Sequence, residues 1–277
     1  MSQLRTLTRL LTGQPTQDGA GVKLVRVIGT QRLPDLDPFL MLDEFSSDEP
    51  QDYLAGFPEH PHRGFETVTY MLAGRMRHQD NQGFEGVLES GDVQWMTAGS
   101  GLIHSEMPEQ EDGLMRGFQL WINLPRAEKM KRPHYQDIAA ARIPEVTGAD
   151  GSRVRVIAGE FAGVRGPVEG VSLAPLYLDL RLPAGSRLTV PVTSGQTALL
   201  FGIEGQLQVA DTSLAKGQLG VLSDGDTLQL VGGEQGGRAL LLAARPLKEP
   251  VARYGPFVMN TQQEIVQAIE DYQAGRF

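Results

Sequence analysis

The sequence contains no cysteine among its 277 residues. This absence excludes disulfide bonds, thiolate nucleophiles and sulfur-rich metal sites, and it fits the reducing cytoplasm, which is the compartment we expect. Long hydrophobic runs are also missing, since the best one, Ala239–Ala244, has six residues where a membrane-spanning helix needs about 20. The N-terminus carries Arg5 and Arg9 but no apolar core followed by a cleavage site, so we expect neither a signal peptide nor a membrane partner.

Basic residues are in the minority, with 25 Lys and Arg against 34 Asp and Glu and a formal net charge of -9. A protein that binds duplex nucleic acid normally presents a concentrated basic face. The densest basic cluster here, from Lys129 to Arg132, is short, and we interpret it as a solvated connection between domains. We therefore expect no direct binding of nucleic acid, and the acidity by itself identifies no other partner.

Turn-forming residues are abundant, with 33 Gly and 17 Pro. From Val22 to about Leu124 they separate short segments with the pattern of β-strands, and after a polar connector at 126–133 a second such region runs from about 153 to 247. Regularly spaced short strands favour a sandwich or a barrel. Examples of the strands expected in the first region are Val22–Ile28, Glu66–Met71, Gly86–Leu88, Val93–Met96 and Gly117–Asn123.

The two strand-rich regions repeat one another. In the first, residues 70–80 precede residues 88–96, and in the second, residues 201–211 precede residues 214–222. Each copy has a strand, a glycine turn, an alternating strand and a strand that follows a glycine. Two copies of one β-unit predict tandem domains, which we place at residues 1–133 and 134–277.

The end of the chain has a different pattern. Thr261 and Glu264 have the spacing of a capping box, and Ile265 and Ile269 follow at a helical interval. Gly275 stands where a helix would end. These signals predict one helix over 261–274 that packs on a barrel.

Three of the five histidines lie in two compact motifs, FPEHPHRGFE at 57–66 and TAGSGLIHSE at 97–106. Side chains two residues apart point to the same face of a strand, so His60 and His62 can converge on one point, as can His104 and Glu106. If the two strands face each other across a barrel, the four side chains meet in its interior. Three imidazoles and one carboxylate suit iron, manganese, nickel, copper or zinc better than calcium or magnesium.

Each motif has a simpler interpretation. A single H-x-H is often a surface or turn feature, and Pro61 fits an irregular edge segment. An exposed His104 near Glu106 would need no metal, and spacing alone leaves open whether Glu66 or Glu106 is the carboxylate ligand. Of the other histidines, His78 could face the site or be a partly exposed sheet residue. We expect His134, in the connector, to be structural or exposed.

Both motifs resemble those of the cupin superfamily, and within it those of the pirin family. Gly56, His60, His62, Glu66 and Gly74 match the first cupin motif, and the second runs from Gly91 to His104. The stretches HPHRGFETVTYML and GDVQWMTAGSGLIHSEMP, and YGPFVMNTQQEI near the end, resemble pirin sequences in particular. The resemblance extends over essentially the whole chain. It implies an all-β bicupin: two tandem jelly-roll-type barrels with a short C-terminal helix.

The resemblance also implies one divalent transition metal in the N-terminal barrel, held by His60, His62, His104 and Glu106. Iron(II) is the expected ion, with manganese, nickel, cobalt, copper and zinc as alternatives. Glu66 then becomes a supporting carboxylate beside the ligands. The second strand-rich region, from about 153 to 247, has no histidine, and we expect the second barrel to be free of metal.

The function implied by the resemblance is that of a quercetin 2,3-dioxygenase, which opens a flavonol ring with oxygen and releases carbon monoxide. Glu106 or Glu66 could accept the proton of the substrate hydroxyl. The alternative is a metal- or redox-sensing regulatory protein without enzymatic activity that binds a transcription factor or a metabolic enzyme. A cupin sugar isomerase would need a polar pocket, which the Met-rich and aromatic surroundings of the motifs disfavour. We expect a monomer.

Overall fold

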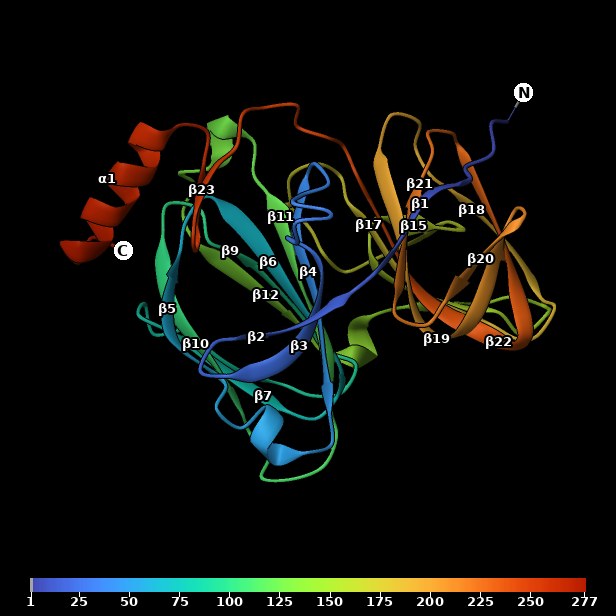
Figure 1. Ribbon diagram of the computed structural model, residues 1–277, viewed down its shortest axis with the longest axis horizontal. Helices are drawn as coiled ribbons and strands as arrows, with labels where there is room; N and C mark the ends of the chain where they lie inside the picture. Colours follow the sequence, from blue (N-terminus) through green and yellow to red (C-terminus); the bar gives the residue numbers. More distant parts are fainter. Residues whose placement is uncertain (1) are drawn as a thin grey trace. The chain divides into compact units, whose positions relative to one another are not determined.

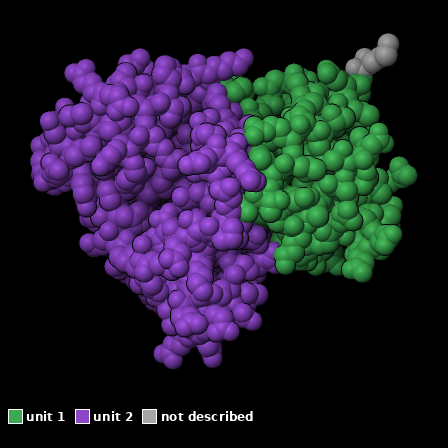
Figure 2. Space-filling model, in the orientation of Figure 1, with its two compact units in different colours: residues 1–13, 141–246 green, residues 14–140, 247–277 purple. Residues whose placement is uncertain are grey.

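The computed structural model describes residues 2–277. The chain forms two compact units, shown in Figure 2. We call residues 14–140 with 247–277 the first barrel unit, and residues 1–13 with 141–246 the second barrel unit. The sequence predicts one domain boundary, after residue 133. The division in the structure differs, because the N-terminal segment joins the later unit and the C-terminal segment joins the earlier one. Each unit is described below by itself.

The barrel of the first unit is formed by two sheets, and a separate C-terminal hairpin is described below; Figure 1 shows the strands. A seven-stranded sheet has the order β12-β9-β6-β11-β4-β3-β2, and a four-stranded sheet has the order β5-β10-β7-β8. The strands are β2 (Gln14–Asp18), β3 (Val22–Ile28), β4 (Phe39–Ser47), β5 (Phe57–His62), β6 (Phe65–Ala73), β7 (Met76–Asp80), β8 (Glu85–Leu88), β9 (Val93–Thr97), β10 (Leu102–Pro108), β11 (Met115–Asn123) and β12 (His134–Ile138).

All five strands expected from the sequence are present, and Val22–Ile28 has the expected bounds. The run from Phe65 to Met71 is buried at every position, and its β-branched and aromatic residues suit a strand that is covered on both faces. The strand that starts at His134 pairs with β9. It therefore belongs to the first barrel unit, although the sequence placed it in the second domain.

The second barrel unit is built on a nine-stranded sheet and a small two-stranded one. The strands are β1 (Leu7–Thr12), β13 (Glu145–Thr147), β14 (Arg153–Ala158), β15 (Glu160–Phe161), β16 (Val164–Arg165), β17 (Leu176–Leu182), β18 (Arg187–Pro191), β19 (Thr197–Val209), β20 (Thr212–Ala215), β21 (Gln218–Leu222) and β22 (Thr227–Ala244). At the N-terminal end, β1 pairs with β21, which is why residues 1–13 belong to this unit.

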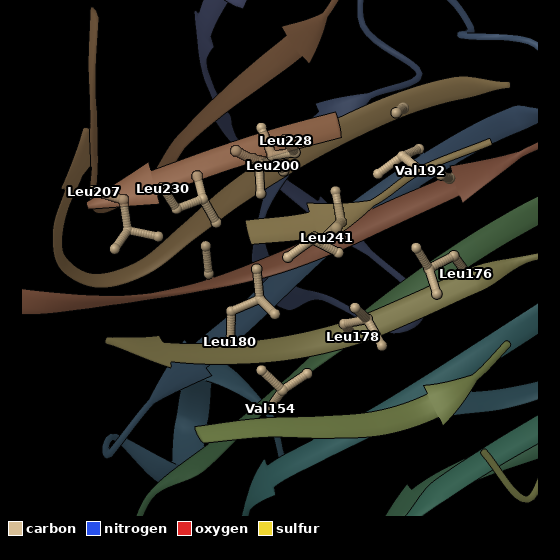
Figure 3. Close-up of a cluster of buried hydrophobic side chains, with 14 of the residues drawn as sticks. Val154, Leu176, Leu178, Leu180, Val192, Leu200, Leu207, Leu228, Leu230 and Leu241 are labelled. Atoms are coloured by element: carbon tan, nitrogen blue, oxygen red, sulfur yellow. The ribbon is translucent and has the colours of Figure 1, made fainter. Parts of the chain in front are cut away.

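Aliphatic side chains fill the interior of the second barrel unit. Leu178, Leu200, Leu230 and Leu241 are completely buried and point toward one another (Figure 3). Val209, the position that matches His78 in the repeat, belongs to the same cluster. The interior of this barrel is therefore a packed apolar core.

The chain ends in a hairpin of β23 (Ala252–Tyr254) and β24 (Phe257–Met259), followed by α1 (Gln262–Gln273). The predicted helix is confirmed: Thr261 and Glu264 form the capping box, and Gly275 follows the helix with φ +66°. Ile265 and Ala268 are buried against the hairpin, so the helix packs on the first barrel unit. Short 3-10 helices lie at Pro50–Asp52, Arg126–Glu128 and Ala140–Arg142. Across residues 2–277, no helix has the length and apolar character needed to cross a membrane.

Candidate metal centre

The three motif histidines lie together on two neighbouring strands. β5 and β10 form an antiparallel pair in which His104 stands opposite His60. The ring centroid of His60 is 4.5 Å from that of His104 and 4.6 Å from that of His62. Each of the three residues has one ring nitrogen that lies within 4.8 Å of the chosen nitrogens of the other two. The sequence brought the motifs together on the condition that their strands face each other across the barrel, whereas the two strands are neighbours in one sheet. They meet because they are adjacent in one sheet and the H-x-H spacing brings His62 to the same face.

Burial makes these imidazoles suitable as ligands. His62 and His104 are 2% and 1% exposed, and desolvation, reinforced by the other histidines, lowers the pKa of both well below the ordinary value. They are therefore neutral near pH 7, the form that binds metals. Nδ1 of His62 and both ring nitrogens of His104 have no hydrogen-bond partner in the described chain. Unpaired buried nitrogen atoms are costly, and a divalent transition metal would satisfy them, so the cluster fits such an ion.

His60 is oriented by the backbone beside it. Its Nδ1 lies 2.8 Å from the carbonyl oxygen of Pro58, which favours a proton on Nδ1 and leaves Nε2 for the cluster. Pro61 lies in β5, which is an edge strand with an irregular register, as the sequence indicated.

Glu106 reaches from β10 to the facing seven-stranded sheet. Nε2 of Gln119 donates to its two oxygens at 3.3 and 3.2 Å, and the Thr69 hydroxyl donates to Oε1 at 3.1 Å. Gln119 and Thr69 stand opposite each other on β11 and β6. In the described chain, the group of donor atoms within 4.8 Å contains only the three imidazoles. The carboxylate lines the same cavity as His60 and His62.

Glu66 lies on β6 in different surroundings. It is 1% exposed and accepts hydrogen bonds from Thr97 Oγ1 at 2.8 Å and Trp95 Nε1 at 3.1 Å, while Lys131 Nζ is 3.4 Å away. Its partners among the described residues include no histidine. From the sequence, Glu66 was expected to support the metal ligands directly. In the structure its carboxylate is hydrogen-bonded instead to the indole of Trp95 and the hydroxyl of Thr97.

The remaining histidines lie outside the cluster. His78 is 2% exposed, with Nε2 2.9 Å from Asp137 and its ring stacked with Phe84 and Tyr135. It is therefore neither a ligand in this group nor a partly exposed sheet residue. His134 is exposed, with Nε2 3.4 Å from the Thr97 hydroxyl.

Two of the three histidines, His60 and His62, border a cavity of about 560 Å³. Apolar side chains form much of its wall: Leu24, Met41, Phe45, Phe57, Met76 and Trp121. The Trp121 ring centroid is 5.2 Å from that of His62. The polar groups of the wall are Asp18, Arg26, Asp43, Glu59, Thr69, Glu106, Gln119 and Arg253 in addition to His60 and His62. The cavity can therefore accept a largely apolar ligand with a few polar groups.

Residues near the end of the chain complete this cavity, and the sequence motifs gave no sign of them. Arg253, Gly255 and Pro256 form part of its wall. The carbonyl of Pro256 accepts a hydrogen bond from the His62 ring. Their contribution depends on chain segments that are far apart in sequence, and no local pattern indicates it.

Lys129 connects the segment that follows His62 to the C-terminal hairpin. It is 1% exposed, and its Nζ donates to the carbonyl oxygens of Gly64 and Val258 at 2.8 and 2.9 Å and to Asn123 Oδ1 at 2.6 Å. Desolvation lowers its pKa to about 8. The interpretation of the Lys129–Arg132 cluster as a solvated connection was therefore wrong for Lys129.

Comparison with known proteins supports the same family. The model of the Pirin family matches residues 21–122, and that of the Pirin C-terminal cupin domain matches residues 177–277. A Pseudomonas aeruginosa protein named "Putative quercetin 2,3-dioxygenase" is 51% identical over 282 residues, covering 99% of each chain. Mouse Pirin is 41% identical over 278 residues, covering 98% of this chain and 93% of its own. The crystal structure of quercetin 2,3-dioxygenase from Acinetobacter baumannii superposes with a TM-score of 0.92 at 36% identity, covering 99% of each chain. The chain belongs to the pirin family of two-domain cupin proteins.

Proposed function

We propose that the protein is a metal-dependent dioxygenase that cleaves quercetin-like flavonols. The observation that carries the proposal is a cluster of three imidazoles beside a largely apolar cavity. His60 and His62 line this cavity, and His62 and His104 are buried and neutral with unpaired nitrogens. The names of the Pseudomonas relative and of the Acinetobacter structure support this reaction. A cavity of about 560 Å³ falls within the range of roughly 300–1,000 Å³ found for small-molecule sites.

In this proposal His60, His62 and His104 hold the metal, and Glu106 is the fourth ligand. Iron(II) is the proposed ion, and it would supply Lewis acidity and redox chemistry toward oxygen when bound. The hydrogen bonds from Gln119 and Thr69 to Glu106 fix the carboxylate on the cavity side of β10. Partners of this kind orient a ligand and tune its basicity.

The walls of the cavity bind and orient the substrate. Met41, Phe45 and Trp121 present flat or flexible apolar surfaces that suit a planar aromatic compound. Glu106 lines the cavity two residues after His104, and we propose that it accepts the proton of the flavonol 3-hydroxyl. Glu66 does not line the cavity. Its role in the proposal is structural: its hydrogen bonds fix the side chains of Trp95 and Thr97 on β9.

The test is oxygen uptake and carbon monoxide release by protein loaded with iron, manganese, nickel, cobalt or copper and supplied with quercetin. We expect turnover with at least one metal and its loss in His62→Gln, while the exposed His134→Gln keeps it. Absence of turnover with every metal would contradict the proposal. A protein that binds metal with its three histidines but consumes no oxygen would favour the metal-sensing regulatory function instead.

A further inference from the structure

Arg253 occupies a defined position in the cavity wall. It lies on β23, and its guanidinium carbon is 4.9 Å from the centroid of the Trp121 ring. Its Nη1 donates to the carbonyl oxygen of Leu40 at 3.3 Å. A cation over an indole face and a hydrogen bond to the backbone together restrict the orientation of the planar group.

The acidic residues of the cavity wall form no direct ion pair with Arg253. No carboxylate of the described chain lies within 4.0 Å of its guanidinium nitrogens, whereas Arg26 forms a two-pronged ion pair with Asp43 at 2.7 and 2.9 Å and a second with Asp18 at 2.7 Å. A guanidinium carries five N–H donors, and Leu40 accepts from one of them. Arg253 therefore keeps donors and a positive charge available at the cavity.

The Trp121 ring connects Arg253 to the histidine cluster. Its centroid lies 5.2 Å from that of His62 and 4.9 Å from the guanidinium carbon of Arg253. A ligand that lies along this indole can reach the histidine cluster with one end and the cation with the other.

We propose that Arg253 selects aromatic ligands that carry an anionic oxygen group, a carboxylate or an ionised phenol, at the end remote from the metal-binding atoms. This inference rests on the proposed function, because it takes the aromatic ligand to be bound with its chelating end at the three histidines. A fork of N–H donors binds two oxygens at once and prefers an anion to a neutral ester or ether.

The experiment compares two ligands with the same chelating group: 3-hydroxyflavone with a 4′-carboxylate and its methyl ester. Binding to the zinc-loaded full-length protein is measured by calorimetry without oxygen, so no turnover is required. We expect the wild type to bind the carboxylate roughly tenfold more tightly than the ester or better. Arg253→Gln removes this preference, and Arg253→Lys retains part of it. The control Arg75→Gln, at an exposed arginine outside the cavity, keeps it in full.

Equal affinity of the wild type for the two ligands, or an undiminished preference in Arg253→Gln, would overturn the proposal. If neither flavone binds, the proposed function fails, and benzoate decides the role of Arg253 in the same samples. Weaker benzoate binding in Arg253→Gln than in the wild type would support an anion site. Equal binding, or none to the wild type, would overturn it.

Discussion

Lys129 Nζ donates a hydrogen bond of 2.9 Å to the carbonyl oxygen of Val258, a residue 129 positions away in the chain. The same ammonium group donates to Gly64, two residues after the candidate ligand His62. A buried cation whose three N–H bonds all have acceptors thus fastens the C-terminal hairpin to the bend that follows the strand carrying His60 and His62.

Replacing Lys129 by Met should destabilise the fold. The substitution leaves two backbone carbonyls and the Asn123 side chain without their buried donor, and we expect the free energy of unfolding to fall by roughly 3 kcal/mol. Urea denaturation measures this loss. The exposed Lys216→Met serves as control and should stay within about 0.5 kcal/mol of the wild type. A Lys129→Met protein as stable as that control would contradict the role of the ammonium.

Gly64 is expected to tolerate no side chain. Its φ is +89°, and a Cβ atom there would lie 2.0 Å from the Val258 carbonyl oxygen. Gly83 has φ +87° with nothing within 4 Å of the same position, so it shares the backbone strain without the collision. We expect Gly83→Ala to cost about 1 kcal/mol and Gly64→Ala about 3 kcal/mol or more. The free energies of unfolding of the two variants are compared by thermal and urea denaturation. Equal losses would show that the hairpin moves away from the added methyl group at no cost in stability.

Asp271 should make stability depend on acid pH. Hydrogen bonds from Arg63 at 2.6 Å, then from Arg276 and Gln267, hold its pKa well below the ordinary value of 3.8. Above pH 3.8 the carboxylate is ionised in both the folded and the unfolded chain, so its stabilising effect is complete. Below that pH the unfolded chain binds a proton that the folded chain does not, and the effect is lost.

The measurement is the difference in unfolding free energy between the wild type and Asp271→Asn, by urea denaturation from pH 7 to pH 3. We expect roughly 1–2 kcal/mol at pH 7 and a smaller difference below pH 3.8. A difference that stays constant over this range would mean that the ionised carboxylate contributes nothing to the contact with Arg63.

Gln119 should influence metal affinity without touching the metal. Its amide donates to both oxygens of Glu106, and loss of such an orienting partner typically weakens metal binding 10- to 100-fold. We expect Gln119→Leu to raise the dissociation constant for zinc(II) about tenfold, as measured by competition with a chelator. Gln79→Leu, at an exposed position of β7, is the matched control. Unchanged affinity in Gln119→Leu would count against Glu106 as a ligand.

Local signals predicted much of this protein. Val22–Ile28 is a short segment rich in β-branched residues, Thr261 and Glu264 form the expected capping box, and the H-x-H spacing brings His60 and His62 together. These features depend on residues within a few positions of one another, where backbone geometry fixes the outcome.

Long-range relationships could not be predicted in the same way. Pairing of β5 with β10 rather than opposition across the barrel is a choice of strand order, which the two motifs do not encode. Lys129 looked like part of a solvated basic cluster because its three acceptors come from residues 64, 123 and 258. Arg253 and Pro256 reach the cavity only once the whole chain is folded.

The interleaved order of the two units has a consequence for how the protein can be divided. Residues 1–13 belong with 141–246, and residues 247–277 belong with 14–140, so a single cut between the two barrels, near residue 140, leaves both units incomplete. A fragment that ends near residue 140 would keep all three histidines but lack the Pro256 carbonyl that His62 faces and the Val258 acceptor of Lys129. During synthesis, the cavity wall is therefore finished by residues that follow the second barrel, long after the histidines themselves have been made.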